Sequence, residues 1–342
     1  MARHSPPPRL GASHGRTPSS EILATPFGRF GAHSVRNAAV EPHIEGRGTA
    51  IRVESAGVPI NPKTIAVFLD ASPSGARRAA QAAAFAQRWG AHLVGIYVVF
   101  KGVTSHHSMA YARSEKAIAG VIAHERRIED ACECATAEMG EYFRTLCAEL
   151  NVSGEFRAIH RGKTAEAAII NSLHSDLLVI GHPEPSGLPD DMSAERILLA
   201  SGVPLLIVPN DWKGETIGGR IMIGWNASPE ARRAVSDAMS FLIAATSVKA
   251  VIVDPAGCKL FGDGAGCDIA LHLGRHGAHV EVEQVASRGR PIAEVILSCA
   301  MQSASDLLVV GARNRTHLRE ILFGNATRTL LTKMPVPVLI SG

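Results

Sequence analysis

Asp306-Leu307-Leu308-Val309-Val310-Gly311, near the end of the chain, repeats a stretch found earlier as Asp176-Leu177-Leu178-Val179-Ile180-Gly181. Each stretch contains a short apolar run without polar alternation, which is typical of a strand in a parallel sheet that is buried on both faces. Two further pairs of segments keep the same order along the chain: Leu69-Asp70-Ala71-Ser72-Pro73 with Trp225-Asn226-Ala227-Ser228-Pro229, and Val203-Pro204-Leu205-Leu206-Ile207-Val208 with Val336-Pro337-Val338-Leu339-Ile340. The sequence therefore predicts two copies of one folding unit.

The segments between the predicted strands have the periodicity of helices. One predicted helix face carries apolar residues that are three and four positions apart: Val235, Ala238, Met239 and Leu242. Strands that alternate with helices predict a parallel sheet with helices on both faces. We expect two tandem α/β units, each an open five-stranded parallel sheet, over residues 63–212 and 213–342. The helical region 114–150 of the first unit is so long that we expect a break in it.

Composition and charge exclude several classes of protein. Residues 1–60 carry seven Arg and four Glu but no Lys or Asp, so that the net charge of +3 belongs to this segment and the rest of the chain is neutral. A neutral body argues against nucleic-acid and membrane-surface binding. The absence of an apolar run of about 18 residues argues against a membrane span. Six Cys without a secretory leader predict free thiols and a cytoplasmic location.

The first 62 residues differ in composition from the rest. They are rich in Pro, Arg, Gly and Ser and show no clean periodicity. Such a segment cannot bury enough apolar surface to offset the entropy of the chain. We therefore interpret residues 1–62 as a disordered tail that precedes the two folded units.

A ligand site is expected where the strands of each unit end. Open parallel sheets bind ligands in a crevice at the carboxyl ends of the strands, where the strand order reverses. In the second unit this position falls on Asn226, Ala227 and Ser228 and on the loop that begins at Gly311. In the first unit the matching residues are Asp70, Ala71, Ser72 and Gly181.

The loop after Gly311 carries the clearest chemical pattern. It reads Gly311-Ala312-Arg313-Asn314, then nine residues, then Gly324-Asn325-Ala326-Thr327. Glycine lets backbone approach a ligand closely, and the N–H groups at the start of a following helix favour an anion such as phosphate. Asn325 or Thr327 can add a side-chain donor, and Arg313 can add positive charge. The alternative interpretation is structural, with Gly311 ending a strand and Gly324 relieving crowding between helices.

From residue 63 onward both units resemble the universal stress protein family. This resemblance implies a Rossmann-like or flavodoxin-like fold and, in the nucleotide-binding members, a Gly-x2-Gly-x9-Gly-Ser/Thr loop and an Asp near the adenine. The second unit keeps Gly311, the nine-residue spacer and Gly324, but Asn314 replaces the second Gly and Asn325 replaces Ser/Thr. Asn226 stands where the Asp is expected. An Asn side chain can still accept a hydrogen bond from an adenine amino group, but it carries no charge.

The first unit departs from the family pattern in the opposite way. Asp70 occupies the adenine-side position, but no phosphate loop follows Gly181. Pro183 and Pro185 remove two backbone donors there, and Glu184 adds a charge that would repel a polyphosphate. We therefore expect the first pocket to be degenerate and not to bind ATP.

The resemblance implies a stress-response protein that binds ATP or another adenine nucleotide, with Mg²⁺, in its second unit. The last strands of the two units, near Leu205 and Val338, are expected to form an intramolecular pseudo-dimer, with further homodimerisation possible. We name no catalytic residue and no metal ligand, because the chain has no Walker A motif and no Gly-x-Ser-x-Gly elbow, and Cys132 and Cys134 lack the spacing of metal ligands. The alternatives are a scaffold without nucleotide affinity and a slow ATP hydrolase.

Overall fold

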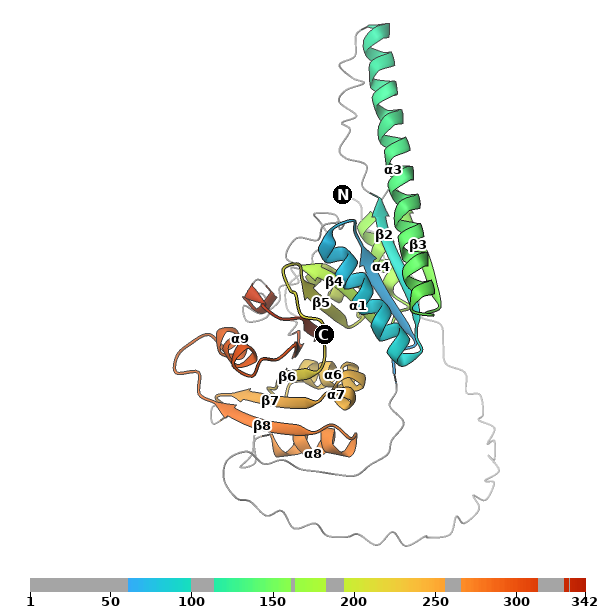
Figure 1. Cartoon of the computed structure of the whole chain (residues 1–342). Coiled ribbons are helices and arrows are strands. Elements are labelled where there is room, and N and C mark those ends of the chain that lie inside the picture. The colour runs from blue at the N-terminus through green and yellow to red at the C-terminus, as the bar shows by residue number, and fades with distance from the viewer. Residues whose placement is uncertain are drawn as a thin grey trace, which may run out of the picture. The chain divides into compact units, whose positions relative to one another are not determined.

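Figure 1 shows a computed structural model of the chain, which describes residues 61–99, 114–160, 164–182, 194–255, 266–312, 329–331 and 333–342. The tail predicted as disordered therefore lies outside the described residues except for its last two positions. In the first half, strands and helices alternate in the order β1 (Thr64–Leu69), α1 (Pro73–Trp89), β2 (His92–Val99), α3 (Glu115–Glu149), β3 (Gly154–His160), α4 (Thr164–Ser172), β4 (Leu177–His182), α5 (Ala194–Ser201) and β5 (Leu205–Pro209).

The second half repeats this alternation. Its elements are β6 (Arg220–Gly224), α6 (Pro229–Asp237), α7 (Met239–Ala244), β7 (Ser247–Val253), α8 (Cys267–Arg275), β8 (Val280–Val285), α9 (Ile292–Gln302), β9 (Leu307–Gly311) and β10 (Val338–Ser341). The apolar repeats that open the sequence analysis are β4 and β9, so both copies of that stretch form the strand that the pattern predicts. The chain therefore has the predicted α/β fold.

All described strands belong to one ten-stranded sheet in the order β3-β2-β1-β4-β5-β10-β9-β6-β7-β8. Neighbouring strands are parallel within each half, while β5 and β10 pair in antiparallel orientation, with Leu206 opposite Leu339. The expectation of two separate five-stranded sheets is therefore corrected to one continuous sheet. The physical reason is that each half would otherwise expose the unpaired backbone groups of an edge strand, and the pairing of β5 with β10 satisfies both edges.

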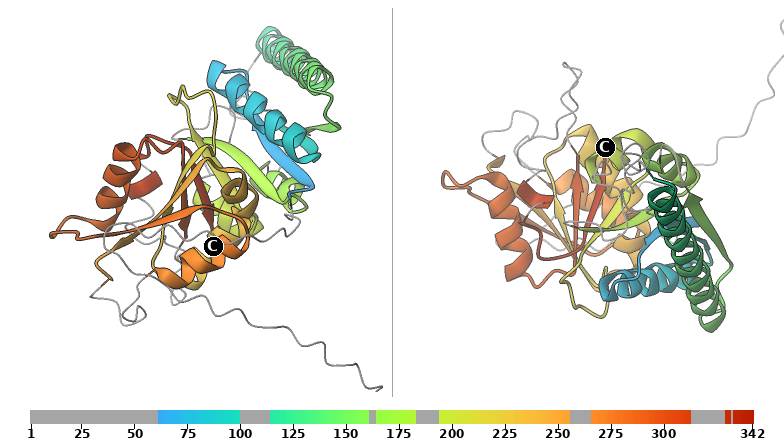
Figure 2. Two further views of the ribbon diagram at one scale, coloured as in Figure 1. Left: turned by 60° about the horizontal axis from the view of Figure 1, so that its bottom comes forward. Right: turned by 90° about the horizontal axis from the view of Figure 1, so that it is seen from above.

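The sheet is covered by helices on both faces, as the continuous apolar strands predicted. Alternate residues of each strand point to opposite faces. Ile65, Val67 and Leu69 belong to the core that contains apolar residues of α1, α3, α6, α7 and α8, whereas Ala66 and Phe68 belong to the core that contains residues of α5 and α9. Figure 2 shows α1 and α3 side by side over the strands of the first half.

Aromatic side chains connect the two halves on the first of these faces. The rings of Phe85 and Trp89, on α1, lie 5.1 and 4.7 Å from the ring of Phe241 on α7, and both contacts are edge-on. Phe85 also stacks on Trp89 at 5.4 Å. Such pairs add about 0.5–1.5 kcal/mol beyond the area they bury. The contact therefore supports the strand pairing from one side of the sheet.

Helix α3 is continuous over 35 residues, and the predicted break within residues 114–150 is wrong. Ser114 caps its start by accepting a hydrogen bond from the backbone N–H of Ala117. The buried side chains belong to the last part of the helix, where Met139, Phe143 and Cys147 contact the core. The first turns extend past the strand ends (Figure 1) and are mostly exposed, so that no tertiary contact demands a bend. None of the helices in the described part of the chain is both long and apolar enough to cross a membrane.

The β5–β10 junction can be tested by paired truncations. Leu206 and Leu339 lie directly opposite each other and are both fully buried. Replacing either one with Ala should lower the free energy of unfolding by about 2–5 kcal/mol. Because the two side chains are cross-strand neighbours, the double variant should depart from the sum of the single variants by about 0.5–3 kcal/mol. Urea unfolding followed by circular dichroism measures these values.

The control pair is Leu93→Ala with Leu339→Ala. Leu93 is equally buried, but it lies on β2, four strands from β10 in the sheet order and hence about 19 Å away. These two changes should be additive. Equal coupling in both pairs, or none in either, would contradict the antiparallel junction.

Candidate functional site

The predicted ligand residues of the second half lie on two neighbouring strand ends. Strand β6 pairs with β9, so that the turn Asn226-Ala227-Ser228, after β6, and Gly311, at the end of β9, share one edge of the sheet. The side-chain oxygen of Asn226 accepts a hydrogen bond from the backbone N–H of Ser228 at 3.1 Å. Ser228 caps α6 by accepting from the N–H of Ala231, also at 3.1 Å. The structure therefore brings these four predicted residues to one edge of the sheet.

Gly311 has a structural role that is independent of any ligand. A Cβ at this position would collide with the backbone of Glu230 and Ala231, at the start of α6. The glycine thus allows α6 to begin directly over the end of β9. Of the two interpretations offered for Gly311, the structural one is supported by this contact, and a Gly311 variant is a poor test of ligand binding because it would also disturb the fold.

The remaining predicted residues of this loop, Arg313, Asn314, Gly324, Asn325, Ala326 and Thr327, lie outside the described residues. The same is true of Pro183, Glu184 and Pro185 in the first half. Their assignment to a phosphate loop, and to a degenerate one, therefore remains a prediction from the sequence.

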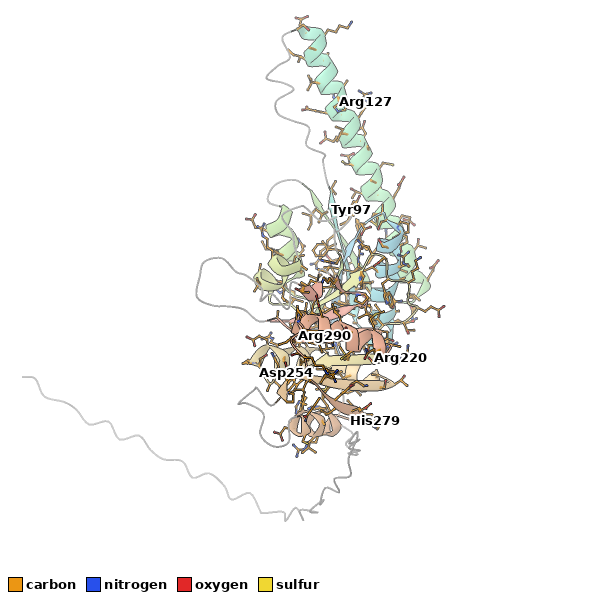
Figure 3. All side chains as sticks on the ribbon, turned by 90° about the vertical axis from the view of Figure 1, so that its left-hand side faces the viewer. Tyr97, Arg127, Arg220, Asp254, His279 and Arg290 are labelled. Carbon is orange, nitrogen blue, oxygen red and sulfur yellow. The ribbon has the colours of Figure 1, made fainter. Side chains whose placement is uncertain are left out.

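Backbone strain gathers at the same edge of the second half. Among the described non-glycine residues with positive φ, Ala227 (54°), Asp254 (51°) and Arg288 (51°) follow the ends of β6, β7 and β8 respectively. A non-glycine residue in this conformation costs about 1–3 kcal/mol and is found most often at functional sites. Figure 3 shows Asp254 and Arg290 at one end of these strands and Arg220 and His279 at the other.

Asp254 is a candidate that the sequence analysis missed. Its carboxylate accepts a hydrogen bond from the backbone N–H of Ser287 at 2.8 Å, and hydrogen bonding from Ser287 lowers the pKa of Asp254. The residue is exposed at the carboxyl end of β7, next to β6 in the sheet. An acid directly after the apolar run Val251-Ile252-Val253 was the available signal, because strand ends of this type are where ligand groups gather.

In the first half the matching carboxylate is already occupied. Asp70 is 7% exposed and forms an ion pair with Arg78, whose guanidinium is equally buried. The other carboxylate oxygen accepts hydrogen bonds from the N–H (2.9 Å) and hydroxyl of Ser72. Burial lowers the pKa of Arg78, and the charge of Asp70 opposes that effect. Both carboxylate oxygens of Asp70 therefore already have partners, and an adenine ring could hydrogen-bond to this carboxylate only by displacing Arg78.

Arg78 also fills the space above the end of β4. A Cβ at Gly181 would collide with the Arg78 guanidinium, and the side-chain oxygen of Asn210 lies 3.4 Å from another nitrogen of the same group. Gly181 corresponds to Gly311 in the second half, and Arg78 corresponds to Ala234. The repeat thus replaces the buried pair Asp70–Arg78 by the neutral pair Asn226–Ala234. The sequence analysis did not anticipate this role of Arg78, since the charge of an arginine gives no sign of burial.

A cavity of about 470 Å³ remains beside the occupied carboxylate. Its walls are the Asp70–Ser72 turn, the end of β2 from Tyr97 to Val99, and one side of α3 that includes Ile128 and Cys132. Burial raises the pKa of Tyr97, with smaller contributions from Cys132 and Asp70. Three of the four predicted first-half residues, Asp70, Ala71 and Ser72, therefore line this cavity, and Gly181 does not.

The cysteines contribute no cluster of metal ligands in the described chain. Cys132, Cys134, Cys147, Cys267 and Cys299 are free thiols, and no group of three His, Cys, Asp or Glu side chains among the described residues could hold a metal ion. The expectation that Cys132 and Cys134 form no metal site remains a prediction, because this statement covers the described residues alone.

The chain is an α/β protein with a mostly parallel sheet and helices on both faces, and its sequence is similar to proteins of one family. Residues 265–341 match the profile of the Universal stress protein family. A universal stress protein of Mycolicibacterium smegmatis is 28% identical over 124 residues, which cover 35% of this chain and 94% of that protein. In these segments the chain is similar to the universal stress protein family.

Solved structures agree on the fold. A universal stress protein from Archaeoglobus fulgidus superposes with a TM-score of 0.56 at 15% identity, covering 81% of this chain and 95% of its own. A functionally unknown protein from Pseudomonas aeruginosa gives a TM-score of 0.49 at 17% identity, covering 82% and 92%. The first of these likenesses extends over both halves and supports the fold alone.

The buried Asp70–Arg78 ion pair predicts that a second substitution will restore stability that a first one removes. Arg78→Ala should lower the free energy of unfolding by about 3–5 kcal/mol, because it leaves the buried Asp70 charge without a partner. Adding Asp70→Asn should recover more than half of that loss, because the second half uses the equivalent neutral pair and Asn226 keeps the hydrogen bond to the backbone. Urea unfolding of the two variants and the parent measures the difference.

Arg77→Ala is the matched control. Arg77 is the exposed neighbour of Arg78 and donates only to the backbone carbonyl of Asn210, at 3.0 Å. Its removal should change stability by no more than about 0.5–1 kcal/mol. If the Asp70→Asn/Arg78→Ala double variant were less stable than Arg78→Ala alone, the interpretation of this pair would be wrong.

Proposed function

We propose that the second half binds an adenine nucleotide, ATP with Mg²⁺, without fast turnover, and that the first half does not. The single observation that supports this asymmetry is the state of the matching residues at the two strand ends. Asp70 is buried and paired with Arg78, whereas Asn226 is exposed and follows a strand whose neighbour ends at Gly311. An adenine amino group can therefore donate to Asn226, while the equivalent oxygens in the first half are taken.

The described residues fit such a ligand in three respects. The Asn226 side chain is held in place by its hydrogen bond to Ser228, so that little side-chain entropy remains to be lost on binding. Asp254 offers an ionised carboxylate on the next strand, of the kind that hydrogen-bonds a ribose hydroxyl. Gly311 brings the start of α6 against the strand end. The phosphates would be held by the predicted loop that includes Gly324, which lies outside the described residues.

The proposed role is a stress-response protein whose conformation or choice of partner depends on the bound nucleotide. The second candidates are a scaffold that binds no nucleotide and a slow ATP hydrolase. The Asp70–Arg78 ion pair favours the scaffold interpretation for the first half, because it occupies the carboxylate there. It does not favour that interpretation for the second half, where Asn226 forms no such pair. We propose a cytoplasmic location on the grounds of the free thiols.

Isothermal titration with ATP and Mg²⁺ should show one nucleotide per chain. Asn226→Ala should weaken binding about five- to tenfold, because the loss of one hydrogen bond costs about 1 kcal/mol. Gly324→Glu should abolish binding, since a carboxylate in the predicted phosphate loop repels the polyphosphate. Circular dichroism checks that each variant is folded.

Ala71→Glu is the matched control, because it places the same charge at the exposed first-half turn. It should leave the titration unchanged. A stoichiometry of two, or loss of binding in Ala71→Glu, would contradict the asymmetry between halves. Absence of saturable binding at millimolar ATP would favour the scaffold, and Mg²⁺-dependent phosphate release that Gly324→Glu removes would favour the hydrolase.

A further inference from the structure

A cavity of about 760 Å³ lies apart from both strand-end turns. One wall comes from the helices of the second half and carries Arg232, Arg233, His272 and His276. The opposite wall comes from segments that precede β1, β4 and β5 in the first half. Neither Asn226 nor Gly311 lines this cavity, and it is therefore distinct from the proposed nucleotide site.

The repeat shows that this cavity is a property of the second half. In the first half, Arg77 and Gln81 of α1 donate to the backbone carbonyls of Asn210 (3.0 Å) and Glu215 (2.7 Å), so that the segment after β5 covers this face of the helix. The matching positions on α6 are Arg233 and Asp237, and both line the cavity instead.

Arg232, which precedes Arg233 on α6, has no cationic counterpart in the first half. Arg232 corresponds to Ala76 of α1, so the second copy carries a guanidinium where the first has a methyl group. Arg232 is exposed, and its backbone N–H donates to the carbonyl of Ser228 at 2.9 Å, whereas its guanidinium has no hydrogen bond or ion pair among the described residues. Its charge is therefore available to a ligand in the cavity.

Two acids line the same cavity, and both are engaged. Asp176 accepts hydrogen bonds from the backbone N–H groups of Lys63 (2.7 Å) and Thr64 (2.9 Å), where it fixes the start of β1. Asp237 lies 3.7 Å from the Nε atom of Arg233, although its Oδ2 atom is buried without a hydrogen-bond partner among the described residues. Three basic side chains, Lys63, Arg232 and Arg233, face the two acids, so that the lining carries a formal charge of +1.

The histidines of α8 add hydrogen-bonding capacity to this lining. His272 and His276 are one helical turn apart, and their rings meet edge-on at 4.9 Å. The Nε2 atom of His272 is shielded from solvent and has no hydrogen-bond partner among the described residues. Burial lowers the pKa of His272, followed by the charges of Arg232, His276 and Arg275. The His272 ring lines the cavity beside Arg232, and a ring N–H next to a guanidinium can donate to an anionic oxygen.

The rest of the lining is uncharged and combines polar residues, including Asn61 and Ser240, with apolar ones. Leu173, Val203, Pro204, Met239 and Ile243 line it together with the charged groups. Its volume falls in the range of about 300–1,000 Å³ that small-molecule sites occupy, and it is much larger than a bare phosphate ion requires. A fitting ligand therefore has an anionic end and an uncharged body.

We infer that this cavity binds a small organic phosphate, with the phosphate against Arg232 and His272 and the uncharged body against Met239 and Ile243. Because the walls belong to different halves, such a ligand would bridge them and stabilise the folded chain. This inference does not depend on the proposed nucleotide site.

The test uses phenyl phosphate, inorganic phosphate and phenol as probes of the full-length protein. Nitrogen–proton correlation spectra report on the His272 and His276 rings, assigned from His→Gln variants. Phenyl phosphate should produce saturable shifts, inorganic phosphate should bind several-fold more weakly, and phenol should produce none. Arg232→Gln should weaken phenyl phosphate about tenfold or more, the value of one hydrogen bond between charged groups.

Arg275→Gln is the matched control, because it removes the same charge from α8 at an exposed position that does not line the cavity. Its affinity should stay within about twofold of the parent, since an exposed charge contributes little. Equal losses in the two Arg variants, or shifts no larger than chloride gives at the same ionic strength, would overturn the inference. Binding that Gly324→Glu abolishes would assign the phosphate to the nucleotide loop instead, and would likewise overturn it.

Discussion

The antiparallel hydrogen bonds between β5 and β10 are the constraint on which the rest of the structure depends. Because every strand of a half runs parallel to its neighbours, this one reversal sets the two halves in opposite directions across a single sheet. The carboxyl ends of one half therefore share an edge with the amino ends of the other. The two strand-end turns, at Asp70 and Asn226, consequently lie at opposite edges, and the cavity beside Arg232 forms where second-half helices meet the amino-terminal segments of first-half strands.

Much of this arrangement could be predicted because it follows from short-range patterns. The apolar runs around Leu178 and Leu308 specify buried parallel strands, and the Ser-Pro pairs at Ser72 and Ser228 start the helices as such pairs are expected to. The sequence predicted that the last strands of the two halves contact each other, but not that they join the halves into one sheet. Apolar periodicity contains no information on which edge strands pair. The continuity of α3 was missed because its first turns make few contacts with the rest of the chain. A helical segment without tertiary contacts has no buried apolar face, so the spacing of its apolar residues does not show where the helix begins.

The candidate sites were predictable to a smaller extent, and the reason lies in particular residues. Asn226 and Gly311 were found because a repeat can be aligned to itself. The burial of Arg78 was not found, because a charged side chain is normally exposed and only its partner Asp70 makes burial tolerable. Asp254 was missed because its role depends on a turn after β8 that donates the Ser287 N–H. Neither of these pairings leaves a periodic trace in the sequence.

The segment of about ten residues between β5 and β6 has a consequence for how this protein changes over evolutionary time. Two identical subunits that meet about a two-fold axis must accept every substitution twice. Here the two partners are one chain, so that their encounter does not depend on dilution and each position can vary alone. Two differences between the halves are of this kind: Asn226 and Ala234 stand where the first half has Asp70 and Arg78, and Arg232 stands where it has Ala76. Tethering thus lets one half specialise while the other preserves the interface.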